Sequence, residues 1–543
     1  MVAMSDIATR LERLSPTIER LMRIGGTPGL SLGVVTNGKP VYHRNYGYRD
    51  LEATLPVTED IIFPTGSLTK ALTAASIAIL VDEKKATWDT LVKDVLPTFQ
   101  SKDETLQSCL TLTDILCHRH GMARGDNLVM GTDSNILVSG QNAMRYINNQ
   151  SRSLPFRGQF TYSNTAYDLA GKVIESLSGQ SYRDFVKSRI LEPLGMDRSF
   201  LQTPPPGTPN VSECYNALDD SSTAPISCPK AGDNGYMGST AGLRSCVNDL
   251  MKLYAAFVTS LNEQPSPGDK ATLESPLKQV TELMFAKVPL DPLSSNETSY
   301  ALGWARVQLP GQMGHIGLNP DLLPTGMPVI GREIPPELVL FHQGSMPGVL
   351  SSAILLPRTE SAIVVLTNSL ALTDVADWVG QLVLEELLGV PEPARPDLIR
   401  FAEMTIEQNL QWYPSTIKQL EEERVHGTSP KDLRQFVGTH WDDVRVFKIV
   451  VTLEDGILYW AFQGLDTEKF PLTHYANDTF TWIQPRNGLS RRGRWVGVDQ
   501  VAAFWKVEFS DKEAGVVDRL YWAHDDDVLP TEFRKDVRGL RSE

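Results

Sequence analysis

The stretch between residues 71 and 81 constrains the fold of this 543-residue chain more than any other feature. Nine of its eleven side chains are Ala, Ile, Leu or Val, so a helix formed here is apolar on nearly every side. Such a helix must be buried on most of its faces. It is also far shorter than the roughly 20 residues that span a bilayer. The stretch therefore predicts a helix inside the core of a globular domain, and we expect no membrane span.

The acidic balance of the chain narrows the classes of partner. Lys and Arg together number 51 and Asp and Glu number 66, which gives a formal net charge of −15 at pH 7. Nucleic acids and anionic membranes offer no positive charge to match this surplus. We therefore expect no nucleic acid as the main partner.

The N-terminus and the cysteines favour a cytoplasmic protein. No basic segment followed by an apolar core stands at the N-terminus, so no secretory signal is visible. The five cysteines are odd in number and form no C-x-x-C pair, which favours reduced thiols over a disulfide framework. A Cys214–Cys228 disulfide is the less favoured alternative. We expect no metal and no cofactor.

Strands at both ends of the first 390 residues, with helices between them, predict an α+β domain. Asn37 and Gly38 form the turn of an expected hairpin. Because further strands follow the helices, we expect one antiparallel sheet, flanked by helices, to unite the two ends of the domain. The expected strands are 29–35, 41–46, 300–308, 338–343, 349–356 and 361–367. The expected helices are 5–24 with a break at Pro16, 67–85, 111–118, 140–150, 165–178, 182–192, 244–260 and 374–388, interrupted by proline-rich loops at 203–209 and 264–276.

A change in composition marks a second domain. Three prolines within six residues end the first domain, which we place at 1–390. A linker and a charged helix broken at Pro414 fill 391–428. From 429 to 543 apolar and polar residues alternate, and this segment holds six of the ten tryptophans. The pattern predicts a C-terminal antiparallel β domain, a meandering sheet or a small barrel, with strands at 446–454, 457–463, 479–484, 495–508 and 516–523.

The tetrapeptide Ser67-Leu-Thr-Lys70 stands at the start of the apolar helix. S-x-x-K occurs four times, but the other three copies fall in proline-containing loops or on a charged, exposed helix. Here the spacing puts both side chains on one helix face, with Lys70 buried. Burial lowers the pKa of an ammonium, and a neutral Lys70 is able to take the proton of Ser67. The helix N-terminus would stabilise negative charge on the reacting oxygens.

Two later motifs carry candidate partners for this serine. Tyr162-Ser-Asn164 precedes an amphipathic helix, and beside Lys70 the phenol would be stabilised as phenolate and shuttle protons. His342-Gln-Gly344 joins a strand to a hairpin, where the glycine permits close approach of a substrate and the N–H of Ser345 is a candidate oxyanion donor. Each motif alone also fits a structural role. Ser67 could cap the helix while Lys70 extends to the surface, Tyr162 could be a core residue, and His342 could be a satisfied residue at a strand edge.

Taken in this order, with Tyr162 standing 95 residues after Ser67, the three motifs resemble those of the serine β-lactamase and penicillin-binding-protein superfamily. The resemblance is to the branch of class C β-lactamases, D-aminopeptidases and related esterases, over about residues 15–388. It implies a β-lactamase/transpeptidase-like fold. The tail from 429 is similar to the lipocalin-like β domains appended to some D-aminopeptidases. Other segments that fit the family are 28–31, 117–122, 191–196, 238–244 and 302–304.

The resemblance implies a role for each motif residue. Ser67 would be the acylated nucleophile, and Lys70 and Tyr162 the acid/base pair. The implied substrate-binding residues are Asn164, which would contact a substrate amide, His342 and Gly344 on the oxyanion strand, and Ser345, whose N–H would form the oxyanion hole with that of Ser67. True β-lactamases usually carry Lys at the His342 position to hold the drug's carboxylate. A mostly neutral His shifts the expectation to esters, lactones, thioesters or peptides.

Three functions from two classes remain. The favoured one is a serine hydrolase that cleaves a small-molecule acyl substrate through a Ser67 acyl-enzyme. The second is an acyltransferase, or transesterase, that excludes water and passes the acyl group to a small-molecule alcohol. The third is a binding protein that kept the fold and lost the chemistry, which is disfavoured because Ser67, Lys70 and Tyr162 are all present.

Overall fold

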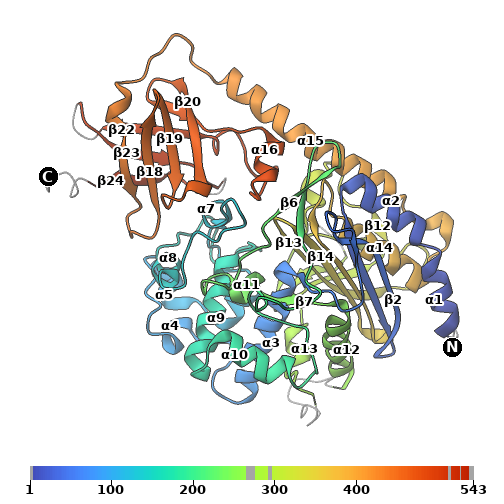
Figure 1. Ribbon diagram of the computed structural model, residues 1–543. Helices are drawn as coiled ribbons and strands as arrows, with labels where there is room; N and C mark the ends of the chain where they lie inside the picture. Colours follow the sequence, from blue (N-terminus) through green and yellow to red (C-terminus); the bar gives the residue numbers. More distant parts are fainter. Residues whose placement is uncertain (1–3, 264–274, 292–295, 512–514, 526–527, 537–543) are drawn as a thin grey trace.

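The computed structural model describes residues 4–263, 275–291, 296–511, 515–525 and 528–536 (Figure 1). Its largest element is a nine-stranded sheet in the order β3-β2-β1-β15-β14-β13-β10-β9-β8, and all neighbouring pairs are antiparallel. Leu30 pairs with Thr367, so the sheet unites the two ends of the domain, as predicted. The strands are β1 Gly29–Thr36, β2 Lys39–Asp50, β3 Leu55–Pro56, β8 Val288–Pro289, β9 Thr298–Tyr300, β10 Ala305–Leu309, β13 Glu337–Met346, β14 Val349–Leu356 and β15 Ser361–Thr367.

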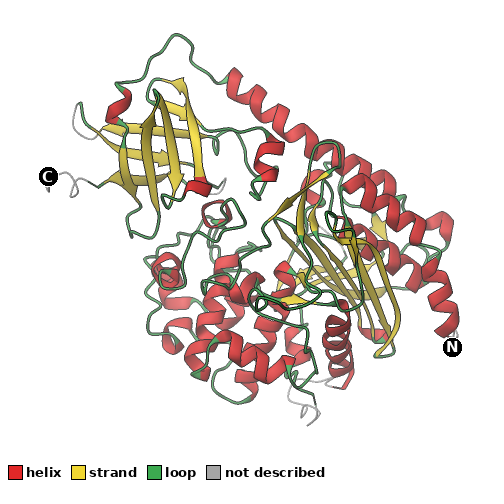
Figure 2. Ribbon diagram, viewed as in Figure 1, coloured by secondary structure: helices red, strands yellow, loops and turns green. Residues whose placement is uncertain are grey.

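Helices cover both faces of this sheet (Figure 2). On one face, α12 (Val247–Glu263) packs so closely on β1 that a Cβ at Gly33 would lie 2.4 Å from Val247. On the other face, α14 (Val375–Leu388) lies against Ile354 of β14. The N-terminal helices α1 (Met4–Glu12) and α2 (Ser15–Gly25) pack on α14, and Pro16 stands at the start of α2, where its missing N–H costs nothing.

The remaining helices and short strands form the part of the domain beside the sheet. The helices are α3 Thr69–Asp82, α4 Val92–Val95, α5 Glu104–Cys109, α6 Leu112–Leu116, α7 Asp126–Val129, α8 Ala143–Asn148, α9 Asn164–Ser178, α10 Tyr182–Val186, α11 Gly238–Ala241 and α13 Val280–Leu283. The short strands are β4 Phe63–Pro64, β5 Cys214–Ala217, β6 Thr223–Ile226, β7 Arg244–Ser245, β11 Gly311–Gln312, β12 Val329–Ile330 and β16 Ser369–Leu370. The predicted loop at 264–276 falls almost wholly outside the described residues.

The apolar stretch that constrains the fold is the buried helix α3. Twelve of its fourteen residues are buried, and it packs against α9 and α11. Its few hydroxyls are satisfied locally, since Thr73 donates to the carbonyl of Ser239 and Ser76 to that of Leu72. The prediction of a core helix is therefore confirmed, and a one-turn 3₁₀ helix, Gly66–Leu68, leads into it.

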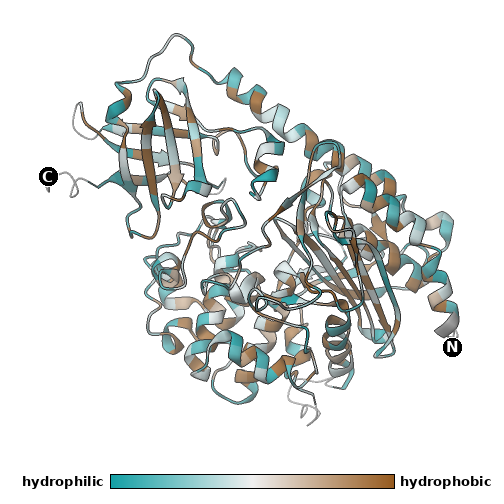
Figure 3. Ribbon diagram, in the orientation of Figure 1, coloured by the Kyte–Doolittle hydropathy of each residue, from teal (hydrophilic) through white to brown (hydrophobic). Residues whose placement is uncertain are grey.

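The C-terminal region is a closed barrel of eight strands. Its interior is filled by aromatic rings; Trp460 and Trp482, for example, are both fully buried with centroids 5.1 Å apart. Hydrophobic residues concentrate in the strands of the barrel and of the large sheet (Figure 3). The predicted small barrel is confirmed. The strands are β17 Gly438–Trp441, β18 Lys448–Glu454, β19 Ile457–Phe462, β20 Lys469–Ala476, β21 Thr479–Thr481, β22 Lys506–Asp511, β23 Val517–Trp522 and β24 Thr531–Lys535.

Two predictions about the C-terminal region are wrong. The helix α15 (Leu398–Glu422) does not break at Pro414 but continues through it. Buried side chains on both sides of the proline, Trp412 and Thr416, hold the helix in place, so tertiary packing offsets the lost hydrogen bond. The predicted strand 495–508 begins only at 506, because the residues before it form a loop that contacts the first domain.

The described residues contain no helix that is long and apolar enough to cross a bilayer. All five cysteines are free thiols.

Candidate active site

Three of the predicted site residues meet at the start of α3. Ser67 lies on the 3₁₀ turn and Lys70 one turn later, which places the Lys70 Nζ 3.0 Å from the Ser67 Oγ. Tyr162, from the segment before α9, donates its O–H to the same Oγ at 2.8 Å. The serine oxygen therefore accepts two hydrogen bonds, one from an amine and one from a phenol.

Lys70 is a core residue rather than a surface one. Its side chain is fully buried, so the alternative in which it extends to the surface is wrong. Besides Ser67, its Nζ donates to the Asn164 Oδ1 at 2.8 Å and to the carbonyl of Thr240 at 3.3 Å, which uses all three of its N–H bonds. Burial lowers the pKa of Lys70 to about 7, against a smaller opposing effect of Asp126. A substantial fraction of the amine is therefore neutral near pH 7.

Tyr162 is a neutral phenol in this site. Burial raises its pKa well above the usual value, and the hydrogen bond to Ser67 opposes this only in part. The predicted phenolate is therefore wrong, because a desolvated core disfavours both the charged phenol and the charged amine. The Tyr162 ring stacks on His118 with centroids 4.6 Å apart, and the His118 Nδ1 accepts the N–H of Ser163 at 3.1 Å. These contacts fix the segment that carries the phenol.

Asn164 links Lys70 to a carboxylate that the sequence analysis missed. Its Oδ1 accepts from Lys70, and its Nδ2 donates to the Asp126 Oδ1 at 2.9 Å. Both ends of the amide are thus engaged within the protein, and a contact with a substrate amide would have to compete with them. Asp126 begins the short helix α7, and no motif or periodicity in the sequence marks it.

The strand β13 carries the candidate oxyanion donor. Ser345 pairs with Leu350 of β14. The N–H of Leu350 donates to the Thr367 hydroxyl, and this hydroxyl donates to the Leu350 carbonyl, so both backbone groups of Leu350 are directed to β15. Ser345 and Leu350 are therefore a non-hydrogen-bonded pair, and the N–H of Ser345 points away from β14. A Cβ on Gly66 would lie 3.2 Å from the Ser345 N, and one on Gly344 would lie 2.9 Å from the Ser67 N. These two glycines let the backbones of Ser67 and Ser345 approach each other.

His342 lies behind Tyr162, not at the surface of the cavity. It is 1% exposed, with its ring centroid 6.4 Å from that of Tyr162. Its Nδ1 donates to the carbonyl of Gln343 at 2.6 Å, and its Nε2 accepts the O–H of Tyr300 at 3.0 Å. Burial lowers its pKa to about 3, so it is neutral at pH 7. His342 is therefore too deeply buried to contact a substrate directly, contrary to the prediction that it binds substrate. Gln343 and Ser345 line the cavity from the same strand.

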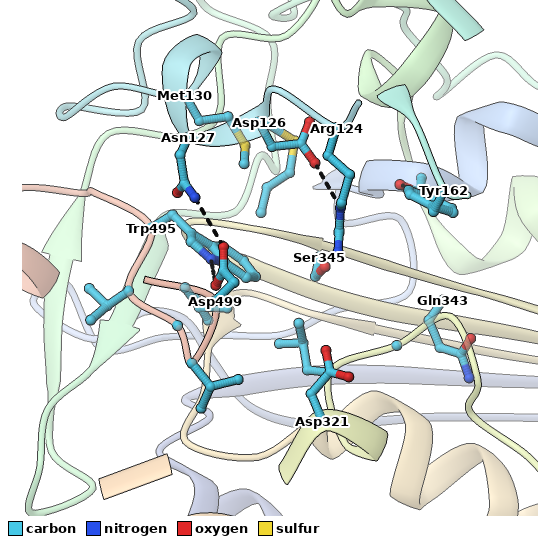
Figure 4. A pocket seen from close by; sticks show the side chains of 18 of the residues that line it. Arg124, Asp126, Asn127, Met130, Tyr162, Asp321, Gln343, Ser345, Trp495 and Asp499 are labelled. Atoms are coloured by element: carbon cyan, nitrogen blue, oxygen red, sulfur yellow. Dashed lines mark hydrogen bonds and ion pairs between the residues drawn. The ribbon is translucent and has the colours of Figure 1, made fainter. Parts of the chain in front are cut away.

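Ser67 lines a cavity of about 480 Å³. Figure 4 shows other side chains that line it, among them Tyr162 and Ser345. Parts of its wall come from segments 121–160, 203–237 and 310–337. One wall is not predicted from the sequence: residues 495–499, from the loop between β21 and β22, and Asp525 also line the cavity. Asp126, Asp321, Asp499 and Asp525 face it together with the cations Arg124 and Arg486. Within the described ranges, no group of three His, Cys, Asp or Glu residues is placed to hold a metal ion.

The chain matches two sequence families. The profile of the Beta-lactamase family covers residues 14–384, which include Ser67, Tyr162 and His342. The chain belongs to this family. Residues 422–541 match a domain of unknown function, DUF3471, which covers the barrel. The predicted superfamily is thereby confirmed.

Curated relatives of this beta-lactamase-family chain include a hydrolase and a penicillin-binding protein. The unguisins hydrolase ungD' of Aspergillus campestris is 36% identical over 179 residues, which are 32% of this chain and 33% of that protein. Penicillin-binding protein 4 of Amycolatopsis lactamdurans is 31% identical over 178 residues, 32% of this chain and 44% of that one. The matches thus span less than half the length of these relatives.

Solved structures support the fold of the beta-lactamase-family domain and of the barrel. An octameric penicillin-binding protein homologue from Pyrococcus abyssi has a TM-score of 0.58 at 20% identity, over 96% of this chain and 99% of that one. A class C beta-lactamase has a TM-score of 0.54 at 22% identity, over 70% of this chain and 97% of that one. The first match extends over both parts of the chain, so their combination occurs in another protein.

Proposed function

We propose that this beta-lactamase-family chain is a serine hydrolase that cleaves an ester, lactone, thioester or amide through an acyl-enzyme on Ser67. The observation that carries the proposal is the pair of hydrogen bonds to the Ser67 Oγ, from Lys70 at 3.0 Å and Tyr162 at 2.8 Å. A serine hydroxyl becomes a competent nucleophile only beside a base. Membership of a family related to hydrolases supports the same conclusion.

Each group has a distinct step in the proposed reaction. Neutral Lys70 takes the proton of Ser67 as the Oγ attacks the acyl carbonyl, and the N–H groups of Ser67 and Ser345 donate hydrogen bonds to the resulting oxyanion. The tetrahedral intermediate collapses when Tyr162 gives its proton to the leaving alcohol, thiol or amine. The tyrosine recovers a proton from the Lys70 ammonium, and the acyl-enzyme remains with neutral lysine. Water then attacks the acyl carbonyl by the reverse sequence.

The charges of the cavity favour substrates without a carboxylate. Four aspartates face it against two arginines, and Arg486 already pairs with Asp219 at 2.8 Å. His342 supplies no positive charge because its pKa is about 3. A β-lactam carboxylate would therefore find little attraction here, which supports esters, lactones, thioesters or amides over antibiotics.

Turnover of a small substrate panel tests the proposal. The panel contains p-nitrophenyl esters, D-amino-acid amides and a chromogenic cephalosporin, and each is measured with the wild-type protein and with Ser67→Ala. We expect hydrolysis of at least one ester or amide, lost in the variant. Equal turnover by Ser67→Ala, or none by the wild type on any substrate, would overturn the proposal.

Acyl transfer to a small-molecule alcohol is the second candidate. The side chains of Leu154, Phe160 and Val496 around the cavity favour it, because apolar walls reduce the access of water to an acyl-enzyme. Product analysis with one acyl thioester, with and without an alcohol acceptor, separates transfer from hydrolysis.

We also propose that the chain divides into a catalytic domain at 1–390, a linker with a helix at 391–428 and a C-terminal β domain at 429–543. We propose a cytoplasmic location as well, in which the free thiols stay reduced.

A further inference from the structure

The loop between β21 and β22 brings part of the barrel to the Ser67 cavity. Residues 495–499, here called the wall segment, line the same cavity as Ser67. Backbone hydrogen bonds from the N–H of Asp133 to the carbonyl of Arg492 at 2.6 Å and from the N–H of Ser134 to the carbonyl of Gly493 at 3.3 Å tie the middle of this loop to the first domain. The wall segment follows directly, so its position depends on how this junction is held.

A buried ion pair lies at this junction. Arg494 is 1% exposed and Glu468, from the turn between β19 and β20, is fully buried, with the Arg494 Nη1 3.5 Å from the Glu468 Oε2. The guanidinium sits over the rings of Phe462 and Trp482, each 5.3 Å away. Among the residues that the structure describes, no hydrogen-bond acceptor reaches the Nε or Nη1 of Arg494. The desolvation of a charge buried this deeply costs free energy, and the pair adds little to the stability of the barrel by itself.

Both members of this pair also contact the first domain. The Glu468 Oε1 accepts the N–H of Thr132 at 2.8 Å, and the Arg494 Nη2 donates to the carbonyl of Asn127 at 3.5 Å. A Cβ on Gly131 would lie only 2.4 Å from the Glu468 Oε1, so the contact requires glycine there. The Arg494–Glu468 pair thus joins the barrel to the residues on and after α7.

The wall segment continues this connection to the cavity. The Asn127 Nδ2 donates to the Asp499 Oδ2 at 3.2 Å, and the Trp495 Nε1 donates to the Asp499 Oδ1 at 3.2 Å (Figure 4). At its far end, the carbonyl of Gln500 accepts from Trp412 and Trp505. The segment is therefore held at both ends, by the buried ion pair before it and by two tryptophans after it.

We propose that Arg494 and Glu468 are positioning residues, which fasten the wall segment so that the barrel forms part of the acyl-donor site and selects donors that fill the cavity. The inference rests on the proposed function, because the selection is exerted on acyl substrates of Ser67. Neither residue touches the reacting atoms. They act through residues 495–499, which contact a donor long enough to reach beyond the Ser67 end of the cavity.

The test is the double variant Arg494→Met/Glu468→Met, which removes both charges and leaves long apolar side chains among the aromatic rings. We expect amides of residues 495–500 to exchange hydrogen about tenfold faster or more. With p-nitrophenyl esters from acetate to decanoate, we expect KM for the longest donor to rise about tenfold or more, with kcat within about twofold. KM for the acetate should not change.

The matched control is Arg519→Met/Glu532→Met, a second ion pair of the barrel whose members do not line the cavity. It should change neither exchange at 495–500 nor any KM. Equal changes for acetate and decanoate, or faster exchange without a change in KM, would overturn the proposal, as would unchanged exchange. If the wild type turns over no substrate of the panel, neither ester nor amide, the proposed function fails by itself, while the exchange measurement still decides whether the ion pair holds the wall segment.

Discussion

The Lys70 Nζ lies 3.0 Å from the Ser67 Oγ in a core where the lysine side chain has no exposed surface. No carboxylate lies within ion-pair distance of this amine among the described residues. Its neighbours are a hydroxyl, an amide oxygen and a backbone carbonyl, so burial dominates and the pKa falls to about 7. This relationship turns a residue that is normally a cation into a base.

The pH dependence of acylation follows from this pKa. Only neutral Lys70 accepts a proton, so kcat/KM should rise with pH through a midpoint near 7 and level off above it. Asp126 raises the pKa of Lys70, so Asp126→Asn should move the midpoint to lower pH. The control is Asp133→Asn, which removes a loop carboxylate that does not affect the pKa of Lys70. A midpoint that Asp126→Asn leaves in place would contradict the assignment of Lys70 as the base.

Lys70→Met should abolish acylation without loss of folding. Removal of a general base costs about 10²–10⁴ in rate. Methionine fits the buried site, and the folded protein no longer has to neutralise an amine, so thermal unfolding should occur at an equal or higher temperature. Burial of the charged Lys70 lowers the free energy of unfolding of the wild type by its full amount below pH 7, and by nothing above the pKa of lysine in the unfolded chain. The stability gained by the variant should therefore shrink between pH 7 and about 10.

Calorimetry of the two proteins across that range measures this difference. A fall of many degrees in the variant would show that Lys70 stabilises the fold instead.

Tyr162→Phe should affect poor leaving groups most. The variant keeps the ring that stacks on His118 and loses only the O–H, whose partner is the Ser67 Oγ. We expect kcat to fall about 10²-fold or more for an alkyl ester or amide, which needs a proton as it leaves. For a p-nitrophenyl ester, which leaves as a stable anion, the fall should be about tenfold or less. Equal losses on both substrates would rule out Tyr162 as the acid.

Gly344→Ala should damage the oxyanion site. The added Cβ would lie 2.4 Å from the carbonyl of Thr65 and 2.9 Å from the Ser67 N, so the strand and the 3₁₀ turn must separate. Loss of one oxyanion donor costs about 10²–10³ in kcat. Gly488→Ala, where the nearest atom is 4.0 Å away, is the control and should be neutral. Wild-type kcat in Gly344→Ala would place the oxyanion elsewhere.

Local patterns in the sequence predicted the core of the site. The turn at Asn37 and Gly38, the all-round apolarity of α3 and the three-residue spacing of Ser67 and Lys70 are set by neighbouring residues, so they can be read without the fold. The position of Tyr162 followed only from the order of the motifs in the family.

Contacts between distant segments could not be predicted. Asp126 joins the site through Asn164, and Asp499 through Asn127, and neither lies in a pattern that repeats with the period of a helix or strand. The alternation at 495–508 predicts a strand, but pairing in the barrel begins only at 506, because the residues before it form a loop that contacts the first domain through Asn127 and Asp499. The pKa of Tyr162 likewise depends on burial by segments far apart in sequence.

The most direct test of the central claim is labelling with an active-site-directed phosphonate, followed by peptide mapping by mass spectrometry. We expect one adduct, on the peptide that contains Ser67, formed faster as the pH rises through 7 and absent from Ser67→Ala. An adduct on another residue, or equal labelling of wild type and Ser67→Ala, would contradict it.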